Sequence, residues 1–459
     1  MIHPTPNRRP AIAAISLTAV LAMPAAAQTI YEDYKVFPHD GEHLDFFGVS
    51  AAIHGSVAVI GAPTDDDNGM NSGSAYLYDT TNGQLLFKLL PEDGAQDDEF
   101  GWDVAISSTT IVVGAKWDDD NGADSGSAYL FDRTTGQQIV KLLPDDGLAG
   151  DWFGSSVAIR DNVALIGANK SGFTQADPGA AYLFNATTGQ QIAKLIPEDS
   201  APNDRFGSSV AISGDIALIG APGCNNRCNN NDANPGSAYL FDINTRKQIA
   251  KLMPNDAAES DSFGGVVALS DNLAIIGAPG NDDNGVDSGS AYLFDLSTGQ
   301  QIAKLLPTDG ASDDNFGWSV AINGTTAVVG AWLDDDNAFD SGSAYLFDTT
   351  TSKQLAKLMP SDGMKSSFFG AAVAIDGTTA LVGAVLDYGN DENSGSVYVF
   401  TTEHCPADLT NDGTLDSFDV SAFLTAYNAQ DPTADFNADG SFNFFDVSAF
   451  VEAYLNGCP

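Results

Sequence analysis

The dipeptide Phe-Gly recurs seven times at nearly constant spacing, and this recurrence constrains the fold more than any other feature of the chain. Successive pairs are separated by 53, 53, 53, 57, 53 and 53 residues, so each pair opens one unit of an internal repeat. The fourth unit is four residues longer and carries Cys224 and Cys228 in its additional loop. The seven pairs begin at Phe47, Phe100, Phe153, Phe206, Phe263, Phe316 and Phe369.

Each unit contains four short segments rich in Val, Ile, Leu, Tyr and Phe, which predict β-strands separated by turns. In the sixth unit the predicted strands span residues 318–322, 326–329, 343–347 and 353–359. Four strands in a repeat of about 50 residues are typical of one blade of a β-propeller, although an open solenoid is also built from repeats.

The two ends of the repeat distinguish a closed ring from a solenoid. After Phe369 only three predicted strands follow, and the last ends at Phe400. The missing fourth strand stands at the N-terminus, where residues 34–38 resemble the segment at 88–91 that ends the first unit. We therefore predict a mainly β fold, a seven-bladed propeller of four-stranded blades. Its N-terminal strand completes the last blade and leaves no long unpaired edge.

Runs of Asp and Asn follow the second predicted strand of four units. The chain has 62 acidic and 19 basic residues, a formal net charge of −43, which disfavours nucleic acid as a partner. This connection lies on the same side of a blade as the connection between blades, so one face of the propeller is expected to be strongly acidic. Such loops either hold calcium ions or form Asx turns, and the sequence leaves both interpretations open. The runs span residues 65–69, 118–122, 282–285 and 334–337.

One lysine stands at the same position near the end of each predicted fourth strand. We interpret these lysines as protection of the outermost strand of each blade against edge-to-edge pairing, rather than as ligand-binding residues. They are Lys35, Lys88, Lys141, Lys194, Lys251, Lys304 and Lys357.

Two twelve-residue segments beyond the repeat, 408–419 and 435–446, match the formula of an EF-hand-type calcium loop. Oxygen side chains stand at positions 1, 3, 5, 9 and 12, glycine stands at position 6, and position 7 contributes its carbonyl. We predict one calcium ion in each loop, followed by an amphipathic helix at 420–427 and at 447–454. The predicted ligands are Asp408, Thr410, Asp412, Thr414, Asp416, Asp419, Asp435, Asn437, Asp439, Ser441, Asn443 and Asp446.

The repeat units resemble the FG-GAP repeats of integrin α-subunit propellers and of many bacterial surface proteins. The first unit pairs Phe47-Gly48 with Gly61-Ala62-Pro63, and the resemblance covers about residues 30–402. It implies a propeller used for binding, usually without catalysis. Integrin-type repeats often carry a calcium loop between these two motifs, but here that connection is a tight turn such as Asn323-Gly324, so those calcium sites do not carry over.

The segment 405–459 resembles a dockerin, with aspartate at position 12 of both loops and a cysteine near each end. This resemblance to the Cys-framed dockerin-like variant implies a cohesin-like or envelope partner. The residues at loop positions 10 and 11, Ser417-Phe418 and Phe444-Phe445, depart from the dockerin pattern and argue against an ordinary cellulosomal cohesin.

The N-terminus has the pattern of a secretory signal peptide, with Arg8 and Arg9 before an apolar stretch at 11–23 and three alanines at 25–27. The mature chain is expected to begin at Gln28, and no later segment is long and apolar enough to span a membrane. In an exported protein, four cysteines predict the local disulfides Cys224–Cys228 and Cys405–Cys458.

The sequence thus predicts a signal peptide at 1–27, a propeller at 28–402 and a calcium-binding dockerin-like domain at 403–459. No catalytic constellation is evident, because none of the five histidines recurs with the repeats. We expect a secreted or cell-surface, non-enzymatic binding or adhesion protein. Its monomeric propeller binds a protein or glycan on the acidic face, and its tail attaches it in a calcium-dependent manner.

Two alternatives stay open. One is a propeller lyase or hydrolase acting on extracellular glycans, which a basic or aromatic constellation near the axis would favour. The other is a purely structural matrix component.

Overall fold

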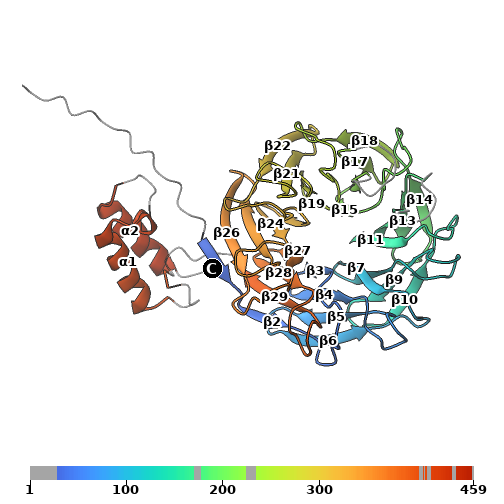
Figure 1. Ribbon diagram of the computed structural model, residues 1–459, viewed down its shortest axis with the longest axis horizontal. Helices are drawn as coiled ribbons and strands as arrows, with labels where there is room; N and C mark the ends of the chain where they lie inside the picture. Colours follow the sequence, from blue (N-terminus) through green and yellow to red (C-terminus); the bar gives the residue numbers. More distant parts are fainter. Residues whose placement is uncertain are drawn as a thin grey trace, which may run out of the picture.

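The computed structural model describes residues 28–169, 177–223, 234–402, 407, 409–410, 415–436 and 441–456. Within these residues, 29 strands form seven sheets arranged in a ring (Figure 1). The predicted mainly β, seven-bladed propeller is thereby confirmed. The predicted signal peptide and all four cysteines of the predicted disulfides lie outside the described residues.

Consecutive strands are antiparallel neighbours within each blade, and the first strand of each blade lies nearest the centre of the ring (Figure 1). Blade one consists of β3 (Ala51–His54), β4 (Val57–Ala62), β5 (Ser74–Asp79) and β6 (Gln84–Leu89). Blade two consists of β7 (Phe100–Ile106), β8 (Thr110–Ala115), β9 (Ser127–Asp132) and β10 (Gln138–Leu142). Blade three consists of β11 (Phe153–Arg160), β12 (Val163–Ala168), β13 (Ala180–Asn185) and β14 (Gln191–Leu195).

The next three blades follow the same order. Blade four consists of β15 (Val210–Ser213), β16 (Ile216–Ala221), β17 (Ser237–Asp242) and β18 (Lys247–Leu252). Blade five consists of β19 (Val267–Ser270), β20 (Leu273–Ala278), β21 (Ser290–Asp295) and β22 (Gln300–Leu305). Blade six consists of β23 (Ser319–Asn323), β24 (Thr326–Ala331), β25 (Ser343–Asp348) and β26 (Lys353–Met359).

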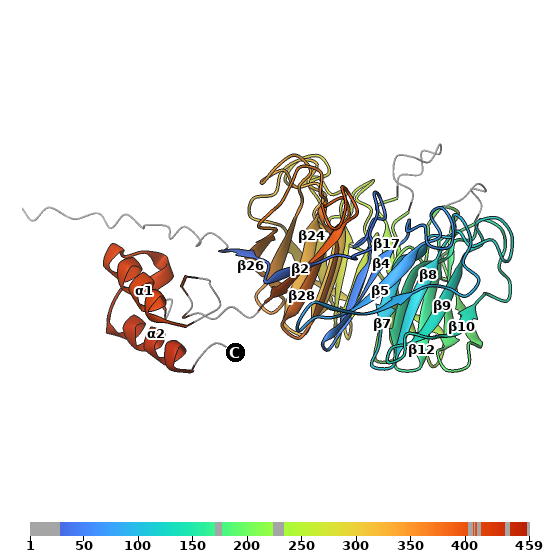
Figure 2. The ribbon, with the colours of Figure 1, turned by 90° about the horizontal axis from the view of Figure 1, so that it is seen from below.

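Blade seven closes the ring with strands from both ends of the propeller. It consists of β27 (Phe369–Asp376), β28 (Thr379–Ala384), β29 (Ser396–Thr401) and the N-terminal β2 (Tyr34–Val36). β2 pairs antiparallel with β29, with Tyr34 opposite Val399, so the predicted closure is confirmed. Figure 2 shows the ring from its edge, with β2 crossing beside the last blade.

One strand was not predicted. β1 (Gln28–Tyr31) adds to the outer edge of blade six, where it pairs parallel with β26 and places Gln28 opposite Ala356. Only Glu32 and Asp33 separate β1 from β2, so the N-terminal segment joins two neighbouring blades. Sequence periodicity does not identify this strand, because it lies outside the repeat and is only four residues long.

The apolar core is divided into seven clusters, one between each pair of neighbouring blades. Between blades seven and one, Val36 of β2 is buried with Phe47 and Tyr76. Phe47 meets the Tyr76 ring edge-on at a centroid distance of 5.4 Å, and each Phe of the repeat makes the same contact in its own blade. The Phe of Phe-Gly is therefore the side chain that packs blade against blade.

The backbone of the same Phe also bridges the preceding blade. Phe153 forms a parallel bridge with Gly126, which follows the acidic loop of blade two. Gly126 has a φ of +81°, and a Cβ atom there would lie 2.0 Å from the carbonyl oxygen of Phe153. Only glycine fits this approach, which explains the glycine that precedes the third strand.

The C-terminal segment forms two helices, α1 (Ser417–Ala429) and α2 (Phe444–Asn456), with a short 3₁₀ turn η1 (Pro432–Ala434) between them. They include both predicted helices. Phe423 of α1 stacks on Phe450 of α2 at a centroid distance of 4.1 Å, and Phe436 packs edge-on against both rings. Within the described residues, no helix is long and apolar enough to cross a membrane.

Removing the closing strand should destabilise the whole ring. Deletion of residues 28–38 removes β1 and β2, and it exposes the apolar cluster around Phe47 together with the edge of β29. We expect the thermal unfolding midpoint to fall by about 10 °C or more, measured by circular dichroism on the otherwise intact mature chain. Deletion of residues 28–31 alone removes only β1 and should cost much less. Equal melting of the 28–38 deletion and the full mature chain would show that β2 does not close the ring.

Candidate functional site

Within the described residues, the repeat lysine of five blades joins a carboxylate of the loop after the second strand to a carboxylate of the connection that enters the blade. In blade two, the ammonium group of Lys141 lies 2.7 Å from a carboxylate oxygen of Asp118 and 2.7 Å from one of Asp120, both in the loop after β8. It also lies 2.8 Å from Asp93, which belongs to the connection entering the blade. The hydroxyl of Tyr129 donates a hydrogen bond to the buried Asp118. One lysine thus neutralises carboxylates from two different loops.

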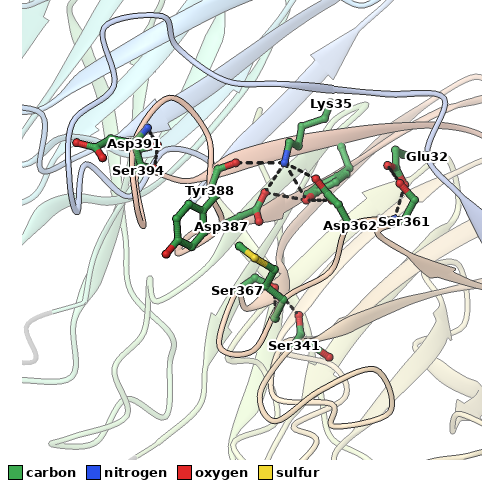
Figure 3. Close-up of polar contacts among 12 residues, drawn as sticks. Glu32, Lys35, Ser341, Ser361, Asp362, Ser367, Asp387, Tyr388, Asp391 and Ser394 are labelled. Carbon is green, nitrogen blue, oxygen red and sulfur yellow. Dashed lines mark hydrogen bonds and ion pairs between the residues drawn. The ribbon is translucent and has the colours of Figure 1, made fainter.

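The same arrangement recurs around the ring. Each repeat lysine pairs with the Asp of the connection that enters its blade. Figure 3 shows the cluster of blade seven, where Lys35 of β2 lies between Asp362 and Asp387 and donates to the carbonyl oxygen of Tyr388. The seven pairs are Lys35–Asp362, Lys88–Asp40, Lys141–Asp93, Lys194–Asp146, Lys251–Asp199, Lys304–Asp256 and Lys357–Asp309.

Edge protection therefore does not describe these lysines. Their side chains range from 6% exposed at Lys357 to 35% exposed at Lys251, and their charges point into the loops instead of along a strand edge. The interpretation missed their role because the carboxylate partners lie in other loops, 23 and 48 residues away in the case of Lys141, and only the folded blade brings them near.

The acidic runs form Asx turns in the four blades where they were predicted. Asp65, Asp118 and Asp334 each accept a hydrogen bond from the backbone N–H two residues later, and Asn281 does the same in blade five. In the described parts of the propeller, no three carboxylate, His or Cys side chains converge as a metal site would require. The lysine ammonium occupies the centre of each carboxylate cluster.

The pKa values of two kinds of carboxylate on this face shift in opposite directions. Burial alone would raise the pKa of Asp93, but the hydrogen bond and the charge of Lys141 outweigh burial and hold the pKa below its ordinary value. Asp45, Asp98 and Asp314 instead accept a backbone N–H three residues earlier in the entering connection, and among the described residues no ammonium group lies within salt-bridge distance of them. Burial, with neighbouring carboxylates adding to it, raises the pKa of Asp45 to about 7 and those of Asp98 and Asp314 to about 6.

All five tryptophans of the chain lie at one end of the inner strands, next to the Phe-Gly and Gly-Ala motifs. In blade two, Lys116 lies over the ring of Trp102 and 4.6 Å from the ring centroid of Trp117, and it pairs with Glu99 at 2.9 Å. Burial lowers the pKa of Lys116 to about 8, although Glu99 opposes the shift. This end carries the acidic loops, because Phe100 bridges Gly73 at the end of the loop of blade one.

Blade six carries the second group of aromatic residues. Trp318 and Trp332 stack with centroids 4.3 Å apart and an interplanar angle of 18°, and Phe368 lies 5.1 Å from Trp332. Sequence reasoning found no aromatic constellation near the axis. An alignment of the seven units could have indicated the grouping, because it places the five tryptophans at only four repeat positions. Their irregular spacing along the chain does not show this grouping.

Seven of the twelve predicted calcium ligands lie within the described residues: Thr410, Asp416, Asp419, Asp435, Ser441, Asn443 and Asp446. Asp408, Asp412, Thr414, Asn437 and Asp439 lie outside them. Both position-12 residues, Asp419 and Asp446, are fully buried at the start of their helices.

The position-12 carboxylates fold back onto their own loops. Asp419 accepts hydrogen bonds from the backbone N–H of Asp416 at 2.9 Å and from the hydroxyl of Thr410 at 2.8 Å. Asp446 accepts the N–H of Asn443 at 2.8 Å. In the first loop the side chains at positions 3 and 12 thus meet, while the side chain at position 9, Asp416, accepts the N–H of Phe418 as the cap of α1. The donors are hard oxygen atoms, which suits calcium, and the two-ion site stays a prediction.

Comparison with protein families matches the FG-GAP repeat at residues 31–78, 86–131, 137–184, 190–241, 247–294, 300–347 and 353–400. The matched residues end before the C-terminal helices. A search of curated proteins finds no significant match.

Lysine replacement should destabilise a blade in proportion to the burial of its ion cluster. Lys357→Met leaves Asp309, Asp334 and Asp336 without their common cation, and Asp334 is buried. We expect a loss of about 3 kcal/mol in the free energy of unfolding, measured by chemical denaturation. Lys194→Met is the matched control, because Lys194 is 31% exposed and, within the described residues, pairs with Asp146 alone, so its loss should stay below about 1 kcal/mol. Equal losses would contradict a buried electrostatic origin.

The Asp45 carboxyl should make stability fall as pH rises. Its folded pKa of about 7 lies above that of an unfolded Asp, so its contribution is complete below pH 4 and is lost progressively up to pH 7. Asp45→Asn keeps an acceptor for the Glu42 N–H and removes the charge. We expect this variant to melt at a higher temperature than the parent at pH 8 and at the same temperature near pH 4.

The opposite sign is expected for Asp40, whose pKa the hydrogen bond and charge of Lys88 hold below its ordinary value against the effect of burial. Asp40→Asn should lower the melting temperature at pH 8, and its penalty should shrink toward pH 3. A shift of the same sign in both variants would refute the assignment.

Proposed function

Since the chain belongs to the FG-GAP repeat family, we propose that it is a secreted, non-enzymatic binding protein whose propeller presents the acidic loop face to an extracellular ligand. The observation that carries the proposal is the ion cluster that ties the described acidic loops of blades one, two, five, six and seven to the connections entering those blades. Loops held by a shared buried cation lose little conformational entropy on binding, which favours recognition of a ligand. The N-terminal signal pattern supports export.

The face is also chemically selective. Its carboxylates repel anionic polymers and attract cations or neutral ligands rich in O–H donors. Blades three and four depart from the acidic pattern in sequence, since Ser171 and Cys224 stand at the repeat position of Asp65, Asp118 and Asp334. This asymmetry gives the ring one sector that differs from the rest. The ligand, a protein or a glycan, lies on this face in the proposal.

We further propose that residues 403–459 form a calcium-dependent attachment module with two ions. Three features support this: the two loop formulas, the buried position-12 carboxylates and the contact of Asp419 with loop positions 3 and 9. Exposed aromatic side chains at the start of both helices, Phe418, Phe444 and Phe445, offer a surface for a protein partner in the envelope or on another chain.

Calcium titration of the mature chain tests the attachment module. We expect isothermal calorimetry to give two ions per chain, because only the two C-terminal loops have a full ligand set. Asp408→Ala combined with Asp435→Ala removes a position-1 ligand from each loop and should abolish binding. The matched control is the chain ending at Thr402, which should bind no calcium.

Other stoichiometries are equally informative. A stoichiometry near zero in the full mature chain would remove the proposed module. Retention of calcium by the 28–402 propeller would assign ions to the acidic loops in addition to their lysines.

A further inference from the structure

The aromatic patch of blade six, formed by Trp318, Trp332 and Phe368, is the feature of the acidic face that neither the fold nor the ion clusters require. The repeat position of Trp318 is occupied by Ser155 in blade three and by Ser208 in blade four. A serine thus satisfies the fold at this position. Trp318 is nevertheless 42% exposed, which is a large apolar surface to leave in solvent.

In blade two, a side chain of the protein itself covers the tryptophan at the repeat position of Trp318. There Trp102 corresponds to Trp318, and Lys116 corresponds to Trp332. Lys116 covers the Trp102 ring and carries its own counterion, Glu99. In blade six no described residue takes the place of this cation over Trp318, and Trp332 covers only one of its faces.

The stacking geometry selects among ligand types. An organic cation is bound best when several rings surround it, as around Lys116. The rings of Trp318 and Trp332 are 4.3 Å apart, so nothing fits between them, and a single flat face remains for a ligand. A flat aromatic face with negative charge density complements the C–H face of a pyranose ring.

The surroundings of the patch supply hydrogen-bond acceptors. Asn315 accepts the indole N–H of Trp332 at 3.4 Å and donates to the backbone oxygens of Asp287 and Asp313, whose side chains are exposed. On the other side, the N–H of Phe368 donates to the backbone oxygen of Asp340. Carboxylates at the rim accept hydrogen bonds from sugar hydroxyls, and the same charges repel an anionic saccharide.

We propose that the open face of Trp318 is a stacking platform for a neutral saccharide, with the rim carboxylates as acceptors for its hydroxyl groups. This inference rests on the proposed binding function of the propeller and names the class of its ligand. Trp318 supplies the apolar contact, Trp332 stacks on its ring, Phe368 packs against Trp332, and Asn315 accepts the Trp332 indole N–H.

The test is a titration of the mature chain with cellohexaose, xylohexaose, mannohexaose and maltohexaose, followed by tryptophan fluorescence and calorimetry. Hexalysine and hexagalacturonate serve as charged probes of similar length. We expect at least one neutral hexasaccharide to bind, at least tenfold weaker binding in Trp318→Ser, and a change of less than threefold in Trp318→Phe, which keeps a flat ring. Trp102→Ser is the matched control and should bind within twofold of the parent. Thermal melting establishes that each variant is folded.

Three results would overturn the platform: no binding of any neutral hexasaccharide, unchanged binding in the folded Trp318→Ser variant, or tighter binding of hexalysine that depends on Trp318. Each of these leaves the proposed calcium-dependent attachment intact, because it is measured separately. The same incubations are assayed for new reducing ends. Saccharide cleavage would contradict the non-enzymatic function while leaving the platform in place.

Discussion

The buried phenylalanine of each Phe-Gly pair is the contact on which the whole ring depends. A four-stranded sheet of this size has two faces and cannot bury both by itself, so its stability comes from its neighbours. The Phe side chain fills the space between two blades, and its backbone bridges a glycine of the preceding blade. Both contacts must be made at once, which fixes the distance and the orientation of neighbouring blades.

A second constraint arises from charge. The chain carries 62 acidic residues, and the fold gathers many of them in the loops at one end of the blades. In blades one, two, five, six and seven, the lysine of the fourth strand reaches the described loop and pairs with two or three carboxylates at once. A bound metal ion could also neutralise such carboxylates, but the lysine ammonium group is part of the chain. The acidic face is therefore held together by the chain itself.

The sequence alone was enough to predict the features that the repeat determines, which are the number of blades and the closure of the ring. The spacing of Phe47, Phe100 and their equivalents determines the number of blades, and the incomplete last unit predicts the pairing of β2 with β29. Contacts between repeats were harder to foresee. Lys141 meets Asp93 across 48 residues, and the Trp318–Trp332 stack joins the residue before β23 to the residue after β24, so neither appears as a local pattern. β1 was missed because a four-residue strand outside the repeat has no periodicity of its own.

The position of β2 has a consequence for how the chain acquires its structure. Asp33 and Thr401, which hydrogen bond beside the closing strand, are 368 residues apart. The closing strand β2 is thus synthesised long before its partner β29, and it must wait until every other blade has been made. Folds dominated by such distant pairings form slowly, and an unpaired strand edge on β29 is a site of aggregation in the meantime. Completion of the ring is consequently a single late event, and a chain interrupted before residue 396 has no means of achieving it.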